Sequence, residues 1–133
     1  QNENIRVALD LTEEWEKASA DGDTKATLIT GVVIARNDFI EAHPDAVETF
    51  LQQYEASVNY VNDNVAEAAV LVGNYDIVAA QVAEKAIPEC NITFIAGNDM
   101  KAKLSSYLGI LFEQNPAAVG GALPNDDFYY NAD

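Results

Sequence analysis

The feature that most constrains the fold is a long amphipathic helix that begins at Pro44. His43-Pro44-Asp45 has proline at the first helical position with an acid beside it, which is a common helix start. Apolar side chains then recur at the spacing of one helical face, while polar side chains occupy the other. The apolar positions are Val47, Phe50, Leu51, Tyr54, Val58 and Val61. We therefore expect this helix to cover a core, with its first four apolar side chains buried.

Three other segments have the composition of β-strands. In residues 4–10, apolar side chains alternate with polar or small ones, which predicts a strand with one buried face. Residues 27–35 are apolar and β-branched on both faces, as in a strand covered on both sides. Thr30 and Gly31 interrupt this run, and mark either a bulge or a place where another group approaches the backbone. A third, short strand is expected at residues 92–95.

The rest of the pattern is helical. A short helix is expected from Thr12 to about Ser19, with acids in its first turn, where the helix macrodipole favours them. Capping residues and turns predict further helices over 64–73, 78–86 and 97–114. In the last of these we expect three leucines to be buried, namely Leu104, Leu108 and Leu111. Phe128 and Tyr129 are expected to hold an extended tail on the body, and the mixed order of strands and helices predicts an α/β fold.

Charge and composition exclude several classes of function. The 133 residues, 49% of them hydrophobic, can form one folded domain with a core. Seven Lys and Arg against 22 Asp and Glu give a net charge of -15, which repels nucleic acids and anionic membrane surfaces. Cys90 is the only cysteine, so the chain has neither an intrachain disulfide nor a cysteine-based metal cluster.

The sequence offers little chemistry for catalysis. The only histidine, His43, stands at a helix start, where it caps the helix or is solvated rather than acting as a base. Acids such as Glu13 and Asp127 are interpreted as surface charges. The alternative is that the chain is a small hydrolase that uses these acids. No phosphate loop, nucleophile elbow or zinc-helix motif is present. We therefore predict no catalytic residue, no metal, no cofactor and no enzymatic activity.

Three stretches together resemble a known family. They are LDLTEEW, GVVIARNDFIEAHPDAVETFLQQYEASVNYVNDNVAEAA and CNITFIAGNDMKAKLSSYLGILFEQNPAAVGGALPNDDFYY. Over nearly its whole length the chain resembles the C-terminal part of the substrate-binding proteins of nitrate/sulfonate/taurine-type ABC transporters. The resemblance implies a partial periplasmic-binding-protein-like (type II) α/β fold, rich in helices and with a few short strands.

The resemblance also implies how the chain is organised. Residues 1–26 would be the end of the second lobe, 27–36 a strand that returns through the hinge, and 37–133 helices packed on the first lobe. The chain begins at Gln1 without a Met, and we expect it to be a fragment whose signal segment lies outside it. The expected location is outside the cytoplasm, in the periplasm or anchored by lipid on the outer face of the cell membrane.

A binding protein of this kind captures a small molecule between two lobes and delivers it to a permease. The resemblance implies a nitrate-, sulfonate- or taurine-like anion or a heteroaromatic compound as ligand. Ligands of α/β sheets lie beyond the carboxyl ends of strands, which makes the residues after the first strand and on the returning strand the candidate ligand contacts. These candidates are Asp10, Thr12, Trp15, Thr30 and Gly31. Trp15 is either a core anchor or an aromatic wall of the cleft.

A second reading remains open from the sequence. The chain is then an acidic helical interaction module whose exposed apolar helix face docks a partner or a second copy, with no small-molecule ligand. Under the first reading, a missing lobe leaves apolar surface uncovered, so we also expect self-association of the fragment.

Overall fold

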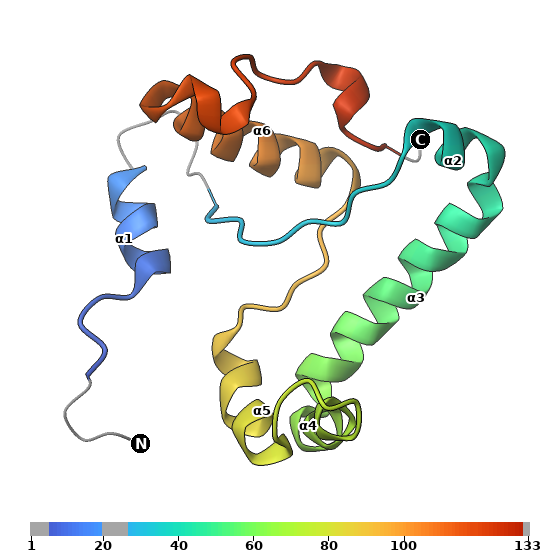
Figure 1. Ribbon diagram of the computed structural model, residues 1–133, viewed down its shortest axis with the longest axis vertical. Coiled ribbons are helices and arrows are strands. Elements are labelled where there is room, and N and C mark those ends of the chain that lie inside the picture. The colour runs from blue at the N-terminus through green and yellow to red at the C-terminus, as the bar shows by residue number, and fades with distance from the viewer. Residues whose placement is uncertain (1–5, 20–26, 132–133) are drawn as a thin grey trace. The chain divides into compact units, whose positions relative to one another are not determined.

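The computed structural model describes residues 6–19 and 27–131. All regular secondary structure in these residues is helical (Figure 1). The structure is 66% helical, and no strand occurs among the residues described. The α-helices are α1 (Leu11–Ala18), α2 (Asn37–Ala42), α3 (Pro44–Asp63), α4 (Val65–Asn74), α5 (Ala80–Ala86) and α6 (Gly97–Gln114). Short 3-10 helices are η1 (Ile87–Glu89), η2 (Pro116–Val119) and η3 (Asp126–Phe128). The expected α/β, periplasmic-binding-protein-like fold is therefore wrong.

All three predicted strands are absent from the described residues. Residues 6–10 and 27–35 have no regular structure, and residues 4 and 5 of the first predicted strand lie outside the described part. The backbone at 92–95 is also irregular, and the carbonyl of Ile92 accepts a hydrogen bond of 2.9 Å from the Asn62 side chain. A strand requires a neighbouring strand for its backbone N-H and C=O groups, and apolar alternation alone does not supply one.

The helix predictions are confirmed to within a few residues. α3 begins at Pro44 as expected, and α4, α5 and α6 lie where capping residues and turns predicted them. The Asn115 N-H donates to the carbonyl of Leu111 at 2.8 Å, and Pro116 follows, so α6 ends at the predicted position. Local signals were sufficient for these elements because most helical hydrogen bonds join residues four apart.

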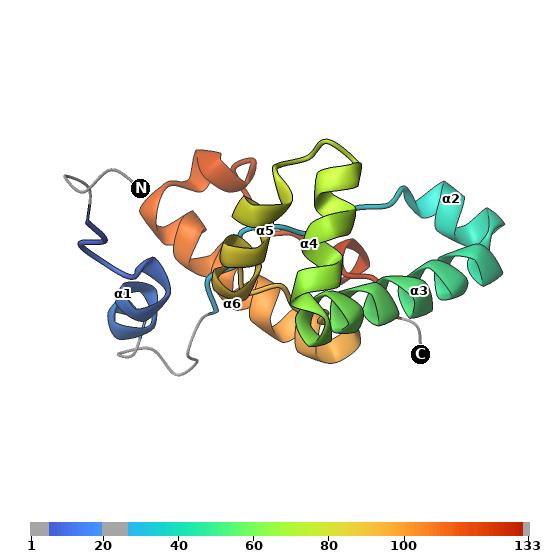
Figure 2. The ribbon, with the colours of Figure 1, turned by 90° about the horizontal axis from the view of Figure 1, so that it is seen from below.

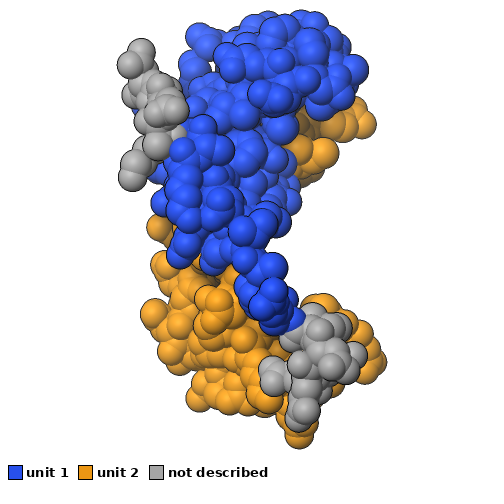
Figure 3. Space-filling model, turned by 90° about the vertical axis from the view of Figure 1, so that its left-hand side faces the viewer, with its two compact units in different colours: residues 1–33, 96–133 blue, residues 34–95 orange. Residues whose placement is uncertain are grey.

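The chain divides into two compact units, which Figure 3 draws in blue (unit 1) and orange (unit 2). Unit 2 consists of Ile34–Ile95 and contains α2 to α5, whereas unit 1 combines Gln1–Val33 with Ala96–Asp133. The predicted division into 1–26, 27–36 and 37–133 stays a prediction.

The core of unit 2 lies between α4 and α5, which pack side by side (Figures 1 and 2). Its buried residues are Ala68, Ala69, Ala83 and Ile87, with Val61, Val65, Val72 and Ile92 packed against them. Alanine side chains let the two helix backbones approach closely, and burial of the apolar side chains stabilises the pair. Because most of this core is alanine, it removes little apolar surface from water.

Unit 1 is arranged around α6. Lys101 of α6 forms an ion pair of 2.9 Å with Asp126 of η3, and its ammonium lies 6.0 Å from the centre of the Tyr129 ring. Tyr129 is buried, as the sequence predicted, but its neighbour Phe128 is 57% exposed. The tail is thus held by Tyr129, and the expectation for Phe128 is wrong.

The predicted burial of the α3 face is also wrong. Phe50 is 46% exposed and Tyr54 is 38% exposed, and their rings stack on each other with centres 5.6 Å apart. Tyr54 also makes a T-shaped contact with Phe94, with the ring centres 5.8 Å apart. The remaining predicted core side chains are only half-buried, and they are Val47, Leu51, Leu104, Leu108 and Leu111. The sequence identified the apolar face correctly, but too little of the chain covers it.

Candidate functional site

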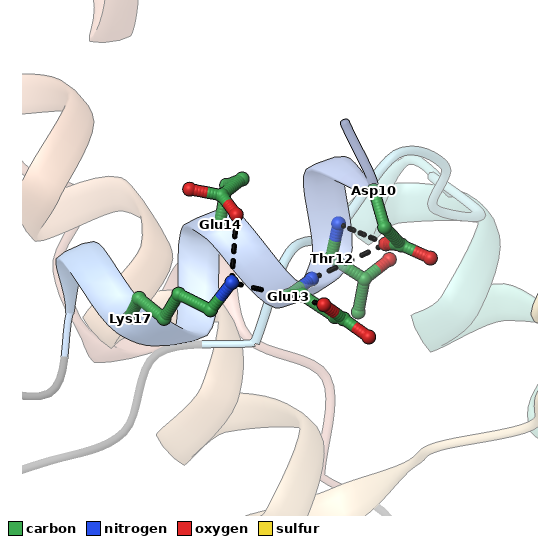
Figure 4. Close-up of polar contacts among 5 residues, drawn as sticks. All are labelled: Asp10, Thr12, Glu13, Glu14 and Lys17. Atoms are coloured by element: carbon green, nitrogen blue, oxygen red, sulfur yellow. Dashed lines mark hydrogen bonds and ion pairs between the residues drawn. The ribbon is translucent and has the colours of Figure 1, made fainter. Parts of the chain in front are cut away.

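The first predicted contact, Asp10, caps helix α1 (Figure 4). Its Oδ1 accepts hydrogen bonds from the backbone N-H groups of Thr12 at 2.9 Å and Glu13 at 3.2 Å. Asp10, and not Thr12 as expected, is therefore the N-cap, and a carboxylate at this position stabilises the helix by about 1 kcal/mol. Free N-H groups at a helix N-terminus can bind an anion, but these two are already paired within the chain.

The charges of α1 are also paired with one another. The Lys17 ammonium lies 2.7 Å from a carboxylate oxygen of Glu14 and 3.7 Å from one of Glu13 (Figure 4). The hydrogen bond with Glu14 raises the pKa of Lys17 above its ordinary value. Since Lys17 is the only cationic residue within α1, an anionic ligand would have to compete with both carboxylates.

Trp15 packs on α6 through its ring. The centres of the Trp15 and Tyr107 rings are 5.3 Å apart, with their planes tilted by 43°. The indole Nε1 is buried, and no acceptor within the described residues meets it. A buried donor without a partner costs about 1–3 kcal/mol, whereas an aromatic pair contributes about 0.5–1.5 kcal/mol beyond its buried area. The contact combines favourable ring packing with the unfavourable burial of an N-H group that has no acceptor.

The remaining two predicted contacts, Thr30 and Gly31, are exposed. A Cβ built on Gly31 would meet no other heavy atom within 4 Å, so the bulge or close approach expected there is not made by the chain itself. Asp10 and Thr12 are joined by a hydrogen bond, and Trp15 follows one turn later. No hydrogen bond of the described residues links Thr30 or Gly31 to them. Ligand binding by these five residues stays a prediction.

Unit 2 has a hollow of about 570 Å³ that was not predicted from the sequence. Its lining residues are Ile34, Ala35, Arg36, Asp38, Phe39, Ala42 and His43. All of them are exposed, so the hollow would leave much of a small ligand in water, unlike an enclosing ligand site. The stretch ARNDF, with Arg36 at the N-cap of α2 and Asp38 in its first turn, was the signal that could have found it.

The polar groups of this hollow are paired internally. Arg36 donates from Nε to Asp38 Oδ1 at 2.9 Å and from a terminal nitrogen to Oδ2. This pairing holds the pKa of Asp38 below its ordinary value. The His43 ring lies 4.9 Å from Phe39, and its side chain makes no capping hydrogen bond with α3. Of the two readings of His43, the exposed side chain fits solvation rather than capping.

The described residues contain no group of three or more His, Cys, Asp or Glu placed to hold a metal ion. In the same part of the chain, no helix is both long and apolar enough to cross a bilayer. Comparisons with protein-family models, with curated proteins and with solved structures give no match for this chain.

Proposed function

We propose that the chain is part of the solute-binding component of an ABC importer. It works outside the cytoplasm. There the chain and further polypeptide of the same component together bind a small molecule and pass it to a permease. The proposal rests on the sequence resemblance, whose most distinctive part, ARNDFIEAHPDAV, leads into the long helix α3.

One structural observation supports the part of the proposal that concerns missing polypeptide: large apolar side chains are left uncovered. Val32, Val33 and Ile34 follow one another in the sequence, and they are 60%, 54% and 84% exposed. Full burial of one such side chain stabilises a protein by about 1.5–3 kcal/mol, so additional polypeptide that covers them is favoured. Under the proposed function, further polypeptide of the same component covers these side chains.

The predicted ligand contacts support an incomplete site. A small-molecule site buries most of its ligand, whereas Asp10, Thr30 and Gly31 are exposed. Half of a cleft lacks both the apolar contact and the dry hydrogen bonds that give affinity. On this proposal the chain binds small anions and heteroaromatics only when the completing polypeptide is present.

A second candidate is an acidic helical interaction module without a small-molecule ligand. The helical character of the described residues favours it, together with the net charge of -15 and the exposed apolar side chains. Under this candidate the uncovered surface docks a different protein.

The reading frame that encodes the chain distinguishes the two candidates. The solute-binding proposal expects continuous coding sequence ahead of the codon for Gln1, with a secretory signal at its start. A frame that starts within a few codons of Gln1 would contradict this proposal and leave the interaction module.

A binding experiment tests the same proposal at the protein level. We expect a panel of small anions and heteroaromatics to leave the melting temperature of this chain unchanged, and to raise that of the product of the full frame. Ligand at a hundredfold excess over its Kd stabilises a protein by about 2.7 kcal/mol, which is several degrees for a domain of this size. In the longer product, Trp15→Ala should reduce the shift, whereas Gly109→Ala in α6 should not. A large shift in the present chain alone would show a complete site and contradict the proposal.

A further inference from the structure

The end of α4 has an unusual residue at its tightest turn. The Asp76 N-H donates to the carbonyl of Gly73 at 3.1 Å, and the Ile77 N-H donates to that of Val72 at 3.2 Å. These two bonds make a Schellman motif, in which the residue after the cap adopts the left-handed conformation. Here that residue is Asp76, with φ of 54°, where glycine is usual.

Aspartate is unfavourable at this position for two separate reasons. A side chain other than that of glycine is strained in the left-handed region, although Asp and Asn tolerate it better than most. A carboxylate at a helix C-terminus also faces the negative end of the macrodipole. No cation of the described residues pairs with Asp76. Because its local geometry does not account for an acid here, we look for a role of Asp76 outside the helix.

Apolar side chains surround this turn on both sides in the sequence. Five of them, here called the docking tip, are each at least two-fifths exposed: Leu71, Tyr75, Ile77, Val78 and Val82. Ile77 is 73% exposed and Tyr75 is 77% exposed, although both lie beside an ordered turn that fixes their backbone. Isolated exposed apolar residues are normal, whereas five within twelve residues of one hairpin are the kind of surface that another protein can cover.

The charges around the docking tip define what kind of partner fits. From Asn37 to Ile95 the sequence contains one Lys or Arg, namely Lys85, whereas Glu67 and Glu84 add to the charge of Asp76 within the α4–α5 hairpin. A second copy of the chain would bring equal negative charge to the interface, which the field of both molecules opposes. A segment with basic residues is attracted by the same field.

We propose that the docking tip binds a polypeptide segment that presents apolar side chains beside a Lys or Arg, and that the cation pairs with Asp76. The segment belongs to the polypeptide that completes the solute-binding component, so this inference rests on the proposed function and deepens it. Its apolar side chains cover Tyr75 and Ile77, and its cation neutralises the end of α4.

A synthetic amphipathic helix of Leu and Lys is the probe, with a Leu and Glu peptide of the same pattern as its control. Peptide binding to the full chain is measured by fluorescence anisotropy, and its place on the chain by amide hydrogen exchange. We expect the Lys peptide alone to bind, with protection over residues 71–82. Asp76→Asn should weaken binding about two- to fivefold, as the loss of an exposed ion pair does, and the effect should fade as salt is raised.

Two variants make the test specific. Glu55→Gln removes an exposed acid of α3 in the same unit, and it should leave the affinity unchanged. Asp76→Gly relieves the strained turn, so it should raise the melting temperature of the chain by a few degrees. The same substitution should lower the affinity for the Lys peptide. This opposite response separates a docking role from a structural one.

Several results would overturn the inference. Equal weakening by Asp76→Asn and Glu55→Gln would show unspecific attraction to a negative chain. Protection elsewhere than 71–82, or full affinity in Asp76→Gly, would place the partner at another surface. Concentration-dependent dimers that protect the docking tip would identify a second copy as the occupant. The two proposals fail in different experiments. A frame that starts near Gln1 removes the proposed function and with it the source named for the segment, whereas an unprotected docking tip removes only this inference.

Discussion

Gly73 of α4 lies directly against Ala80 of α5. A Cβ built on Gly73 would stand 3.1 Å from the Ala80 Cβ and 3.2 Å from its backbone nitrogen. The absence of a side chain at residue 73 is therefore what allows the two helices to pack at this distance. The sequence predicts a helix that ends at residue 73, but the packing role of Gly73 could not be predicted from it because the contact with Ala80 is tertiary.

We predict that Gly73→Ala destabilises the chain by about 1–3 kcal/mol, as overpacking of a tight contact does. The neighbouring atoms belong partly to backbone and cannot move aside as a flexible side chain would. Urea unfolding followed by circular dichroism measures the change. Gly109→Ala is the matched control, because a Cβ there meets nothing within 4 Å in the middle of α6. It should raise stability by about 1 kcal/mol through helix propensity. Equal gains from both variants would contradict the close packing.

A second prediction concerns the turn after η2. Gly120 has φ of 79°, its N-H donates to the carbonyl of Ala117, and the N-H of Gly121 donates to that of Pro116. Gly120→Ala should cost about 1–2 kcal/mol because the alanine side chain is strained in the left-handed region. The free energy of unfolding in urea measures this cost. Gly31→Ala has open space and no positive φ, so it should change stability by no more than a few tenths of a kcal/mol. A neutral Gly120→Ala would show that the turn relaxes.

The helices were predictable from the sequence, and the strands were not. Pro44 and Asn115-Pro116 act on their own helix ends, so the neighbouring residues contain the whole signal. The run at 27–35 shows only that its side chains are apolar, because the strand that would pair with it must come from elsewhere. Without such a partner among the described residues, Val33 and Ile34 remain exposed.

The candidate site, too, could be predicted only where its contacts join residues close together in the sequence. Thr12 was expected to begin α1, but Asp10 makes the capping hydrogen bonds, and two residues of this type so close together cannot be ranked by propensity alone. The meeting of Trp15 with Tyr107 joins residues far apart in the chain, and nothing local predicts it. The docking tip depends on the left-handed turn at Asp76, which the sequence does not mark with a glycine.

A third prediction concerns alkaline pH. Burial raises the pKa of Tyr129, the nearby Lys101 lowers it, and Asp126 raises it slightly further. Because the folded chain disfavours the phenolate, this contribution to stability is full below the unfolded pKa of about 10. It is lost as pH rises through the higher folded value. Ultraviolet absorbance of the phenolate, compared between the chain and Tyr129→Phe, should give a Tyr129 pKa above 10.

Lys101→Ala tests the cause of this shift. Loss of the ammonium removes a group that favours the phenolate, so the pKa of Tyr129 should rise further. A fall after the substitution would show that Lys101 keeps water away from the ring rather than stabilising its charge.

The last prediction concerns the unpaired N-H of Trp15. Trp15→Phe keeps an aromatic ring against Tyr107 and removes the buried donor. The smaller ring loses about 1 kcal/mol of burial, whereas removal of an unsatisfied donor returns about 1–3 kcal/mol. The free energy of unfolding should therefore be unchanged or higher, as measured in urea by circular dichroism. Trp15 is the only tryptophan, so the parent chain reports the same site by its fluorescence.

Trp15→Leu is the control, since it removes the donor and the aromatic ring together. It should be less stable than Trp15→Phe by about 0.5–1.5 kcal/mol, the contribution of the ring pair beyond its area. If Trp15→Phe instead loses stability to the same extent as Trp15→Leu, the indole N-H has an acceptor in solution. The Trp15 side chain would then be fully satisfied where it lies, and its burial would carry no cost to the packing of α1 on α6.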